Sequence, residues 1–311
     1  MESPSVAVVV VSYNTKQITL ECLDSVRSSR PPDGIELVVV DNGSQDGTPE
    51  MVHHLYPEAR LLQNTSNLGF AAACNQGIRS TSAPFVLLLN SDARISDSTI
   101  DSLLFCMRSS DQCAAAACSL LDATGRVRRS TFRFLTAFNQ ALELVGVARL
   151  APARFRRSRR PRPDANGLDR SVDWIEASCL ILRRAALEQV GLLDERFFMY
   201  SEDEDLCWRL RRSGWLVCYT DRGRAIHLGG ESAKQNPFQS MCHFYRSQYL
   251  LLMKHRGGLS AHAYILANRT ALLLKYFWYR LCGRDTRARD ARMRWTALSS
   301  ATRTGSGCDF L

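Results

Sequence analysis

The chain has 311 residues, of which 45% are hydrophobic and 23% are charged, so it can bury the core of one large or two small α/β domains. This composition excludes intrinsic disorder as the default state. The net charge of +9 gathers between Arg126 and Arg162 and between Lys275 and Arg303. Such basic stretches suit an anionic partner, namely phosphate-bearing substrates, nucleic acid or an acidic membrane surface, and a solvated basic face explains them equally well.

Three largely apolar runs predict strands buried on both faces of a parallel sheet, at Val6–Val11, Ile35–Val40 and Phe85–Leu89. A shorter strand is expected at Leu61-Leu62. Helical patterns lie between these strands, at Ile18–Val26, after Thr48-Pro49, and at Phe70–Ile78. The alternation predicts an α/β fold with a mostly parallel, Rossmann-like sheet flanked by helices.

The second half of the chain is less regular. Strands are predicted at Ala114–Leu121, Val172–Ile175, Ser178–Leu182 and Trp215–Tyr219, and helices at Leu187–Leu193, Glu202–Arg212, His243–Arg256 and Ala261–Leu281. The Pro/Arg-rich stretch from Arg149 to Asp164 is expected to form a mobile loop.

The cysteines and the N-terminus indicate a cytoplasmic protein. The eleven cysteines form no CxxC pair and no Cys/His grouping with zinc-finger spacing, so we expect free, buried thiols in a reducing compartment. The N-terminus lacks the basic and apolar regions of a signal peptide. No segment has the ~18 uninterrupted apolar residues of a membrane span.

Two acidic residues follow predicted strands, and the carboxyl ends of parallel strands are where ligands bind in such sheets. Asp92 comes two residues after Asn90, and its carboxylate suits a hard divalent ion that bridges a diphosphate. Asp41 suits a hydrogen bond from the base or ribose of a nucleotide. The alternatives are a helix cap at Asp92 and an Asx-turn at Asn42-Gly43.

Four adjacent carboxylates follow Ser201, at residues 202–205. Ser201 and Glu204 fit a capping box, with Ser201 as the N-cap of the next helix. Asp203 then lies in the first helical turn, where the helix dipole favours the ionised carboxylate that a general base needs. A cap and a catalytic role are equally good explanations from these residues alone.

Two further side chains have a functional and a structural interpretation. His227 follows a strand and precedes Gly229-Gly230, where an imidazole suits a metal ion, although a lone histidine is more often structural. Trp174, beside Asp173, suits stacking on a sugar ring, although core packing is the more common role of a lone tryptophan.

In their order these motifs resemble glycosyltransferase family 2, which has the GT-A fold. The resemblance runs from about Val6 to His227 and rests on Val-Ser-Tyr-Asn at 11–14, Val-Asp-Asn-Gly-Ser at 40–44, Asn-Leu-Gly-Phe at 67–70, Leu-Asn-Ser-Asp at 89–92, Val-Asp-Trp-Ile at 172–175 and the acidic motif at 198–209. The acidic motif is similar to that of the rhamnosyltransferase-like branch, which acts in bacterial cell-envelope polysaccharide assembly. Asn90 departs from the aspartate that usually opens the metal motif, and Ala177-Ser178 stands where Gly-Ala is more usual.

The resemblance implies a role for each matching residue. It implies a catalytic base at Asp203, metal ligands at Asp92 and His227 for Mg²⁺ or Mn²⁺, nucleotide or donor contacts at Ser12, Asn14, Asp41, Asn67, Gly69, Asn75 and Ser91, and sugar or acceptor contacts at Asp173, Trp174 and Glu202. It places a GT-A domain at residues 1–235, with a nucleotide-binding half at 1–120 and an acceptor and catalytic half at 121–235.

The function that follows is an inverting hexosyltransferase that moves rhamnose or a similar sugar from a dTDP- or UDP-sugar to a glycan or lipid-linked acceptor. Residues 236–311 are expected to be helical and basic, and the apolar and basic mixture around Phe277 resembles a helix that lies on an anionic membrane surface. The alternative to a membrane-surface helix is a C-terminal helix packed in the core. The alternatives to a glycosyltransferase are a nucleotidyltransferase and a non-catalytic nucleotide-sugar-binding or membrane scaffold. No nucleic-acid-binding motif is present, so nucleic acid is not an expected partner.

Overall fold

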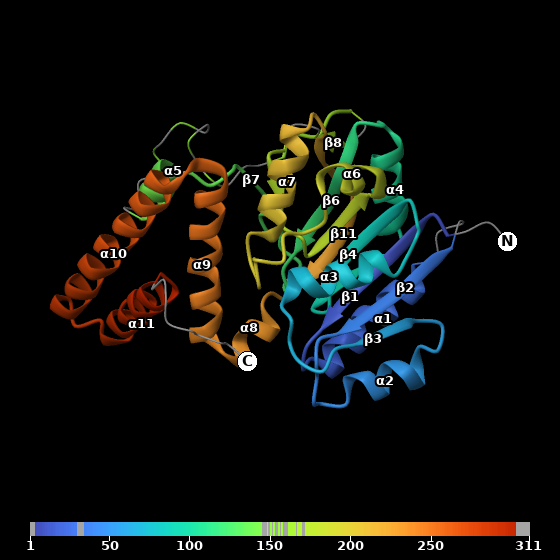
Figure 1. Ribbon diagram of the computed structural model, residues 1–311, viewed down its shortest axis with the longest axis horizontal. Helices are drawn as coiled ribbons and strands as arrows, with labels where there is room; N and C mark the ends of the chain where they lie inside the picture. The colour runs from blue at the N-terminus through green and yellow to red at the C-terminus, as the bar shows by residue number, and fades with distance from the viewer. Residues whose placement is uncertain are drawn as a thin grey trace. The chain divides into compact units, whose positions relative to one another are not determined.

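The computed structural model describes residues 4–29, 34–144 and 172–302, together with residues 148, 150, 152, 155, 157, 161–165 and 167–169. Half of the loop predicted at Arg149–Asp164 lies outside the described residues. The chain divides into two compact units (Figure 1). The sheet unit comprises Met1–Phe132, Arg160–Arg196 and Glu202–Ser232, and the helical unit comprises Arg133–Arg159, Phe197–Ser201 and Ala233–Leu311.

The sheet unit contains a mixed sheet in the order β3-β2-β1-β4-β10-β6-β11-β5, with β8 paired to β11. Its strands are β1 (Val6–Ser12), β2 (Ile35–Asp41), β3 (Arg60–Gln63), β4 (Phe85–Asn90), β5 (Ala93–Ile95), β6 (Cys113–Leu121), β8 (Leu168–Asp169), β10 (Cys179–Arg183) and β11 (Leu216–His227). A separate ribbon joins β7 (Thr131–Phe132) to β9 (Trp174–Ile175). Strands β3, β2, β1 and β4 run parallel, as do β6 and β11, so the predicted α/β class with a mostly parallel sheet is confirmed.

Helices cover both faces of this sheet. The helices of the chain are α1 (Lys16–Ser28), α2 (Thr48–Leu55), α3 (Phe70–Arg79), α4 (Thr99–Arg108), α5 (Ala137–Leu144), α6 (Arg184–Val190), α7 (Glu202–Arg212), α8 (Glu231–Gln235), α9 (Pro237–Arg256), α10 (Gly258–Leu281) and α11 (Asp285–Ala301). The side chains of α1, α2 and α4 share a core with Val8 and Val39, whereas α3 packs on the opposite face against Val9 and Val40. Because both faces are covered, the central strands β1 and β4 are almost entirely apolar.

Helix α3 lies so close to the sheet that only glycine fits at residue 77. A Cβ atom there would stand 2.3 Å from Val9 Cγ1 and 3.3 Å from Val40 Cγ2. Gly77→Ala should therefore lower the free energy of unfolding by about 1–3 kcal/mol, although alanine is the better helix former. Urea unfolding measures this loss, and a double variant with Val9→Ala should lose less than the sum of the two single losses. An unchanged or higher stability of Gly77→Ala would contradict the close packing.

Several predicted elements have different bounds. Strand β11 continues eight residues beyond Tyr219 to His227, past a register irregularity between Tyr219 and Arg224, where polar residues hide it in the sequence. Strand β9 begins only at Trp174, and α6 ends at Val190 because Gly191 leaves the helical conformation at φ 84°. Helix α11 was not predicted, since it has no strong apolar period. Helix α4 was also not predicted, although its buried Ile100, Leu103, Leu104 and Met107 have helical spacing.

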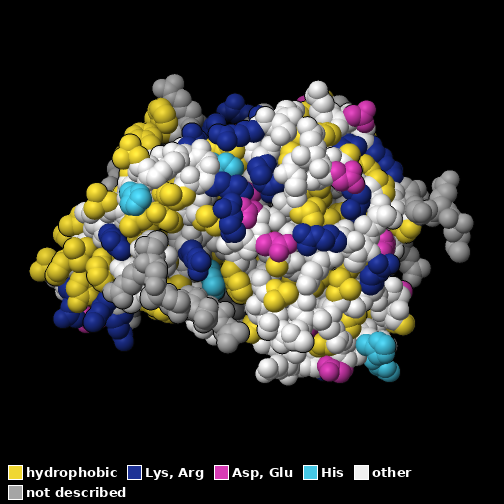
Figure 2. Space-filling model, viewed as in Figure 1, with side chains coloured by type: hydrophobic (Ala, Val, Ile, Leu, Met, Phe, Trp, Pro, Cys, Tyr) yellow, Lys and Arg dark blue, Asp and Glu magenta, His cyan; other side chains and the backbone are white. Residues whose placement is uncertain are grey.

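The helical unit has a core of its own. Tyr264, Leu251 and Leu252 are buried between α9, α10 and α11, and α5 also packs against α10. The opposite side of α10 is apolar and exposed, as Figure 2 shows in the hydrophobic side chains over this helix. Among the described residues, no helix combines the length and the hydropathy needed to cross a bilayer.

Candidate active site

The loops after β1 and β2 lie side by side at the carboxyl edge of the sheet. Strand register pairs Ser12 with Asp41, and the Ser12 hydroxyl donates to Asp41 Oδ2 at 3.0 Å. Asp41 is 1% exposed, and its Oδ1 accepts the backbone N–H groups of Gly43 and Ser44, which is the Asx-turn given above as the alternative to a nucleotide contact. Asn14 has a φ of 49° and its Oδ1 accepts the N–H of Gln45, so the two loops are joined.

Asparagine side chains hold the turn before α3 against this loop. Asn42 Nδ2 donates to Asn67 Oδ1 at 2.8 Å and to the carbonyl of Gly69 at 3.2 Å. Asn67 Oδ1 also accepts the N–H of Gly69, whose φ is 88°. The Asn75 amide is bonded on both sides to the backbone of Leu193, so in this structure it fastens α3 to the segment that precedes α7.

Asp92 and His227 meet where β5 pairs with β11. The antiparallel register places His227 opposite Ala93, and His227 Nε2 lies 3.1 Å from Asp92 Oδ1. Both residues are buried, with His227 5% exposed and Asp92 7% exposed. On the other side of the imidazole ring, Glu176 Oε1 lies 3.2 Å from His227 Nδ1. Glu176 has no assigned role in the motifs and was not predicted.

The three side chains form a charged triad. Burial alone would lower the pKa of His227, but hydrogen bonds to Asp92 and Glu176 raise it to about 9. Burial would likewise raise the pKa of Asp92 and of Glu176, but hydrogen bonds, first of all with His227, and nearby positive charge lower both below their usual values. The fold therefore holds two ionised carboxylates around one imidazole.

Helix α7 begins at the acidic motif, as predicted, but its first turn is capped differently. Asp203 Oδ1 accepts the N–H of Glu204 at 2.7 Å, the group that the capping box assigned to Ser201. Tyr200 and Ser201 have φ of 72° and 66°, a left-handed conformation that costs about 1–3 kcal/mol per residue outside glycine. The Asp203 carboxylate therefore binds the N–H group that the capping box assigned to Ser201.

A short series of contacts links Asp203 to Asp92. Asp203 Oδ2 accepts the N–H of Ala177 at 3.0 Å. The preceding residue, Glu176, contacts His227, which contacts Asp92. Residues 92, 176, 203 and 227 are distant in the chain and converge at one edge of the sheet. Asp203 is 8% exposed, and burial is the main cause that raises its pKa to about 7.

Residues 7–191 match the model of the family described as glycosyl transferase family 2. The chain belongs to glycosyl transferase family 2. It is therefore a glycosyltransferase of the hexosyltransferase type, and its fold is GT-A.

Two relatives of this glycosyltransferase are informative. The N-acetylglucosaminyl-diphospho-decaprenol L-rhamnosyltransferase of Mycobacterium tuberculosis is 30% identical over 252 residues, which cover 75% of this chain and 78% of the relative. The succinoglycan biosynthesis protein ExoA of Rhizobium meliloti is 27% identical over 264 residues, which cover 83% of this chain and 73% of the relative.

The fold of this glycosyltransferase is also found among solved structures. The mannosyltransferase PcManGT of Pyrobaculum calidifontis, solved in complex with GDP-Man and Mn²⁺, superposes with a TM-score of 0.58 at 17% identity, over 98% of this chain and 77% of that chain. At this identity the similarity establishes the GT-A fold.

The residues at the edge of the sheet fit a divalent cation. Asp92 and His227 offer an oxygen and a nitrogen 3.1 Å apart. Two buried oxygens, Asn90 Oδ1 and Glu202 Oε2, have no hydrogen-bond partner among the described residues. Burial and the neighbouring Asp203 raise the pKa of Glu202 well above its usual value. Unpartnered buried oxygens are costly, and a bound ion or substrate would satisfy them.

The structure places the residues predicted to contact the sugar or the acceptor, and the predicted donor contact Ser91, as follows. Trp174 is 8% exposed and stacks on Phe132, with ring centroids 4.6 Å apart and an interplanar angle of 22°. Its neighbour Asp173 is half-buried. Ser91 lies 3.3 Å from Thr15, measured between the hydroxyl oxygens, so it joins the β4 end to the loop after β1.

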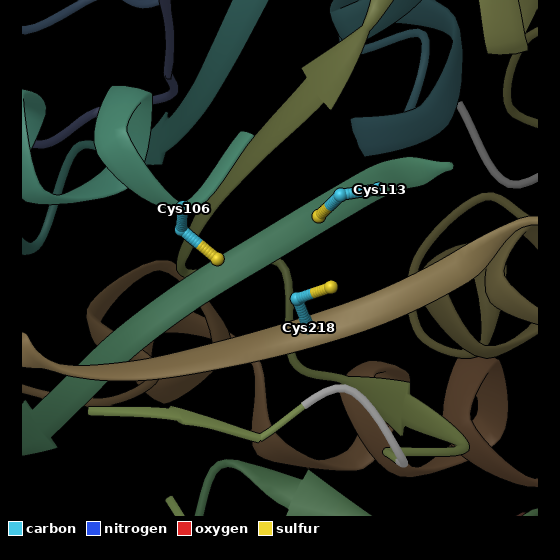
Figure 3. A group of neighbouring side chains, drawn as sticks. All are labelled: Cys106, Cys113 and Cys218. Atoms are coloured by element: carbon cyan, nitrogen blue, oxygen red, sulfur yellow. The ribbon is translucent and has the colours of Figure 1, made fainter. Parts of the chain in front are cut away.

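A cluster of three cysteines, a residue type that can bind metal ions, lies elsewhere in the glycosyltransferase. The sulfur atoms of Cys106, Cys113 and Cys218 are within 4.8 Å of one another. Figure 3 shows these three side chains. Metal binding needs thiolates. The neighbouring thiols and burial raise the pKa of Cys113, which keeps it protonated. Cys113 begins β6 and Cys218 lies near the start of β11, at the end opposite His227, so we interpret the cluster as core packing.

The raised pKa of Asp203 predicts a pH dependence for the glycosyltransferase. A general base at Asp203, the role that the motif implies, would act in its ionised form, so kcat/KM should then fall as pH drops below about 7, by roughly tenfold per pH unit. Initial rates between pH 5 and pH 8.5 at saturating metal would measure this fall. A base of ordinary aspartate pKa would leave kcat/KM flat down to pH 5, and a flat profile would contradict a base with the raised pKa of Asp203.

Proposed function

We propose that this glycosyltransferase transfers a sugar from a nucleoside diphosphate donor to an acceptor hydroxyl with inversion at the anomeric carbon. The observation that carries the proposal is the convergence of Asp92, His227 and Asp203 at the carboxyl edge of the sheet. A scaffold without catalysis would have no use for this arrangement, and membership of the family argues against it as well.

Asp203 is proposed as the general base. Its carboxylate takes the proton from the acceptor hydroxyl, and the oxygen then attacks the anomeric carbon from the face opposite the diphosphate. One base and one in-line displacement invert the anomeric centre. Asp92 and His227 would hold Mg²⁺ or Mn²⁺, and the bound cation supplies positive charge to the leaving diphosphate.

The nucleotide is proposed to bind along the loops after β1, β2 and β3. Asp41, Ser12, Asn14, Asn67 and Gly69 line this edge, with Ser91 beside them. Asn75 is proposed to act indirectly, by fixing α3 to the segment before α7. Trp174, Asp173 and Glu202 are proposed to contact the acceptor or donor sugar.

The proposed donor is dTDP-rhamnose or a related dTDP- or UDP-sugar, and the proposed acceptor is a glycan or a lipid-linked glycan of the bacterial cell envelope. The mycobacterial relative, whose name gives the transfer of L-rhamnose and an N-acetylglucosaminyl-diphospho-decaprenol acceptor, supports the sugar and the lipid-linked acceptor. The relative in succinoglycan biosynthesis supports a polysaccharide product.

A donor screen tests the proposal. The purified chain would be incubated with dTDP-rhamnose, UDP-glucose, UDP-galactose and GDP-mannose, each with Mn²⁺ or Mg²⁺, and nucleoside diphosphate release and thermal stability would be followed. We expect one donor to raise the melting temperature and to be turned over in the presence of a diphospholipid-linked sugar. Turnover without inversion, read from the anomeric signal of the product by NMR, would contradict the mechanism.

The helical unit is proposed to bind the anionic inner surface of the cytoplasmic membrane. Its α10 exposes Leu259, Leu266, Leu273, Leu274, Phe277, Trp278 and Leu281, at 46–88% of their surface. Spacings of seven and four residues place most of them on one helix face. Arg280 and the arginines of α11 supply positive charge nearby, which complements acidic lipid headgroups.

Vesicle flotation tests this docking. The chain should float with vesicles that contain phosphatidylglycerol at low salt and less at high salt, and Phe277→Glu/Trp278→Glu should weaken binding by about tenfold or more, because each aromatic side chain buried in lipid contributes at least ~1.5 kcal/mol. Leu55→Glu, an exposed leucine of the sheet unit, is the matched control. Absence of flotation at low salt would count against the membrane surface.

A further inference from the structure

Glu176 contacts the side of the His227 ring that faces away from Asp92. Glu176 Oε1 lies 3.2 Å from Nδ1, and Asp92 Oδ1 lies 3.1 Å from Nε2. The two ring nitrogens point in different directions, so Glu176 does not share a ligand position with Asp92. A carboxylate on the far nitrogen of a metal-binding histidine fixes which nitrogen carries the proton.

We infer that Glu176 is a positioning residue that holds the Nδ1 proton of His227 and so presents Nε2, with its lone pair, to the metal ion beside Asp92. The inference rests on the metal site of the proposed function and extends it to the residue that orients the ligand. A neutral imidazole has one N–H donor and one acceptor nitrogen. An acceptor at Nδ1 selects the tautomer in which Nε2 is free to bind the cation.

The surroundings leave Glu176 as the acceptor for this proton. Arg128 Nη1 also lies near Nδ1, at 3.4 Å, but a guanidinium cannot accept a hydrogen bond. Arg128 instead donates to the backbone carbonyl of His227 at 3.1 Å, which holds the end of β11 in place. The His227 side chain is 6% exposed, so solvent does not replace a lost partner freely.

Glu176 is itself fixed. The Ser178 hydroxyl donates to Glu176 Oε1 at 2.6 Å, and the Glu176 backbone N–H donates to the Ser130 carbonyl at 3.1 Å. The next residue, Ala177, donates its N–H to Asp203 Oδ2. A single segment, residues 176–178, therefore positions both the proposed metal ligand and the proposed base. The negative charge of Glu176 also makes the imidazole a stronger ligand.

Mn²⁺ binding to the nucleotide-free chain tests the inference without an activity assay. Free Mn²⁺ would be titrated by EPR at pH 8 with the wild type, Glu176→Ala, Glu176→Gln, Asp92→Ala and the exposed control Glu188→Ala. We expect Glu176→Ala to bind Mn²⁺ about 10–100-fold more weakly, as for other residues that support a metal ligand. Glu176→Gln keeps an acceptor oxygen but not the charge, so we expect a smaller loss of about three- to tenfold. Glu188→Ala should match the wild type.

A spectroscopic signature separates positioning from simple structural support. Pulsed EPR of bound Mn²⁺ detects ¹⁴N coupling from a coordinated imidazole, and we expect this signal in the wild type and its reduction in Glu176→Ala. A merely structural Glu176 would change the melting temperature and leave the affinity and the ¹⁴N signal unchanged.

The outcomes distinguish the two proposals. If the wild type and Asp92→Ala bind Mn²⁺ equally, the metal site of the proposed function is wrong. If Asp92→Ala loses binding while Glu176→Ala and Glu176→Gln stay within twofold of the wild type, only the role of Glu176 is overturned. If Glu176→Ala does not fold, Glu176→Gln decides, and wild-type affinity with a wild-type ¹⁴N signal overturns the inference.

Discussion

Replacing Asp203 with asparagine is expected to lower the rate of sugar transfer by about 10²–10⁴-fold, the usual contribution of a general base. The asparagine oxygen can still accept an N–H from Ala177 or Glu204, so the start of α7 should persist, but the amide cannot take a proton from the acceptor. Donor binding, measured by calorimetry with the nucleoside diphosphate sugar, should stay close to that of the wild type. Single-turnover kinetics would separate binding from the chemical step.

The control for this substitution is Asp101→Asn, which removes an exposed carboxylate from α4 of the same unit. It should retain the wild-type rate. An Asp203→Asn enzyme that keeps a tenth or more of the wild-type rate would refute the role of Asp203. A loss of donor affinity as large as the loss of rate would indicate that Asp203 supports the site and does not act as the base.

Removing the cation is expected to stop transfer. EDTA should abolish activity, and added Mn²⁺ or Mg²⁺ should restore it, because the charge that develops on the leaving diphosphate would otherwise be uncompensated. Asp92→Ala should lower the rate by about 10²–10³-fold at a metal concentration that saturates the wild type. The physical reason is that Asp92 supplies the carboxylate of the proposed metal site and holds His227 Nε2 at 3.1 Å.

Metal titration of the rate tests this second prediction. Asp92→Ala should require far more Mn²⁺ for half-maximal activity, whereas Cys218→Ala, which alters the buried thiol cluster, should show the wild-type metal dependence. Full activity in EDTA after exhaustive dialysis would exclude the site at Asp92 and His227.

The nucleotide half of the fold was predictable because its strands are buried on both faces. Short apolar runs such as Val6–Val11 that alternate with helical patterns are typical of buried parallel strands. The observed strands β1, β2 and β4 each extend one residue beyond the predicted end. Strand β11 was only half predicted, because Asp221 and Arg222 interrupt its apolar pattern. Pairing with β6 and β5 keeps this part extended, and no local signal in the sequence reports that pairing.

Candidate site residues could be predicted where they stand in a family motif. They were missed where only contacts between distant segments bring them to the site. Asp92, Asp203 and His227 stand in recognisable motifs, whereas Glu176 is a single acidic residue after a tryptophan. Its importance depends on the register that brings His227 opposite Ala93, which only the fold reveals. Ser201 and Glu204 satisfy a capping pattern in sequence, yet the left-handed backbone at Ser201 leaves the cap to Asp203.

The central claim is that Asp41, Asp92, Asp203 and His227 surround one nucleoside diphosphate and its cation. A crystal structure with Mn²⁺ and dTDP or UDP, with data collected at the manganese absorption edge, tests it most directly. The account predicts one anomalous peak in contact with the Asp92 carboxylate, His227 Nε2 and the diphosphate, with the nucleoside against Asp41. A peak at the Cys106, Cys113 and Cys218 sulfurs, or a diphosphate bound away from Asp92, would contradict it.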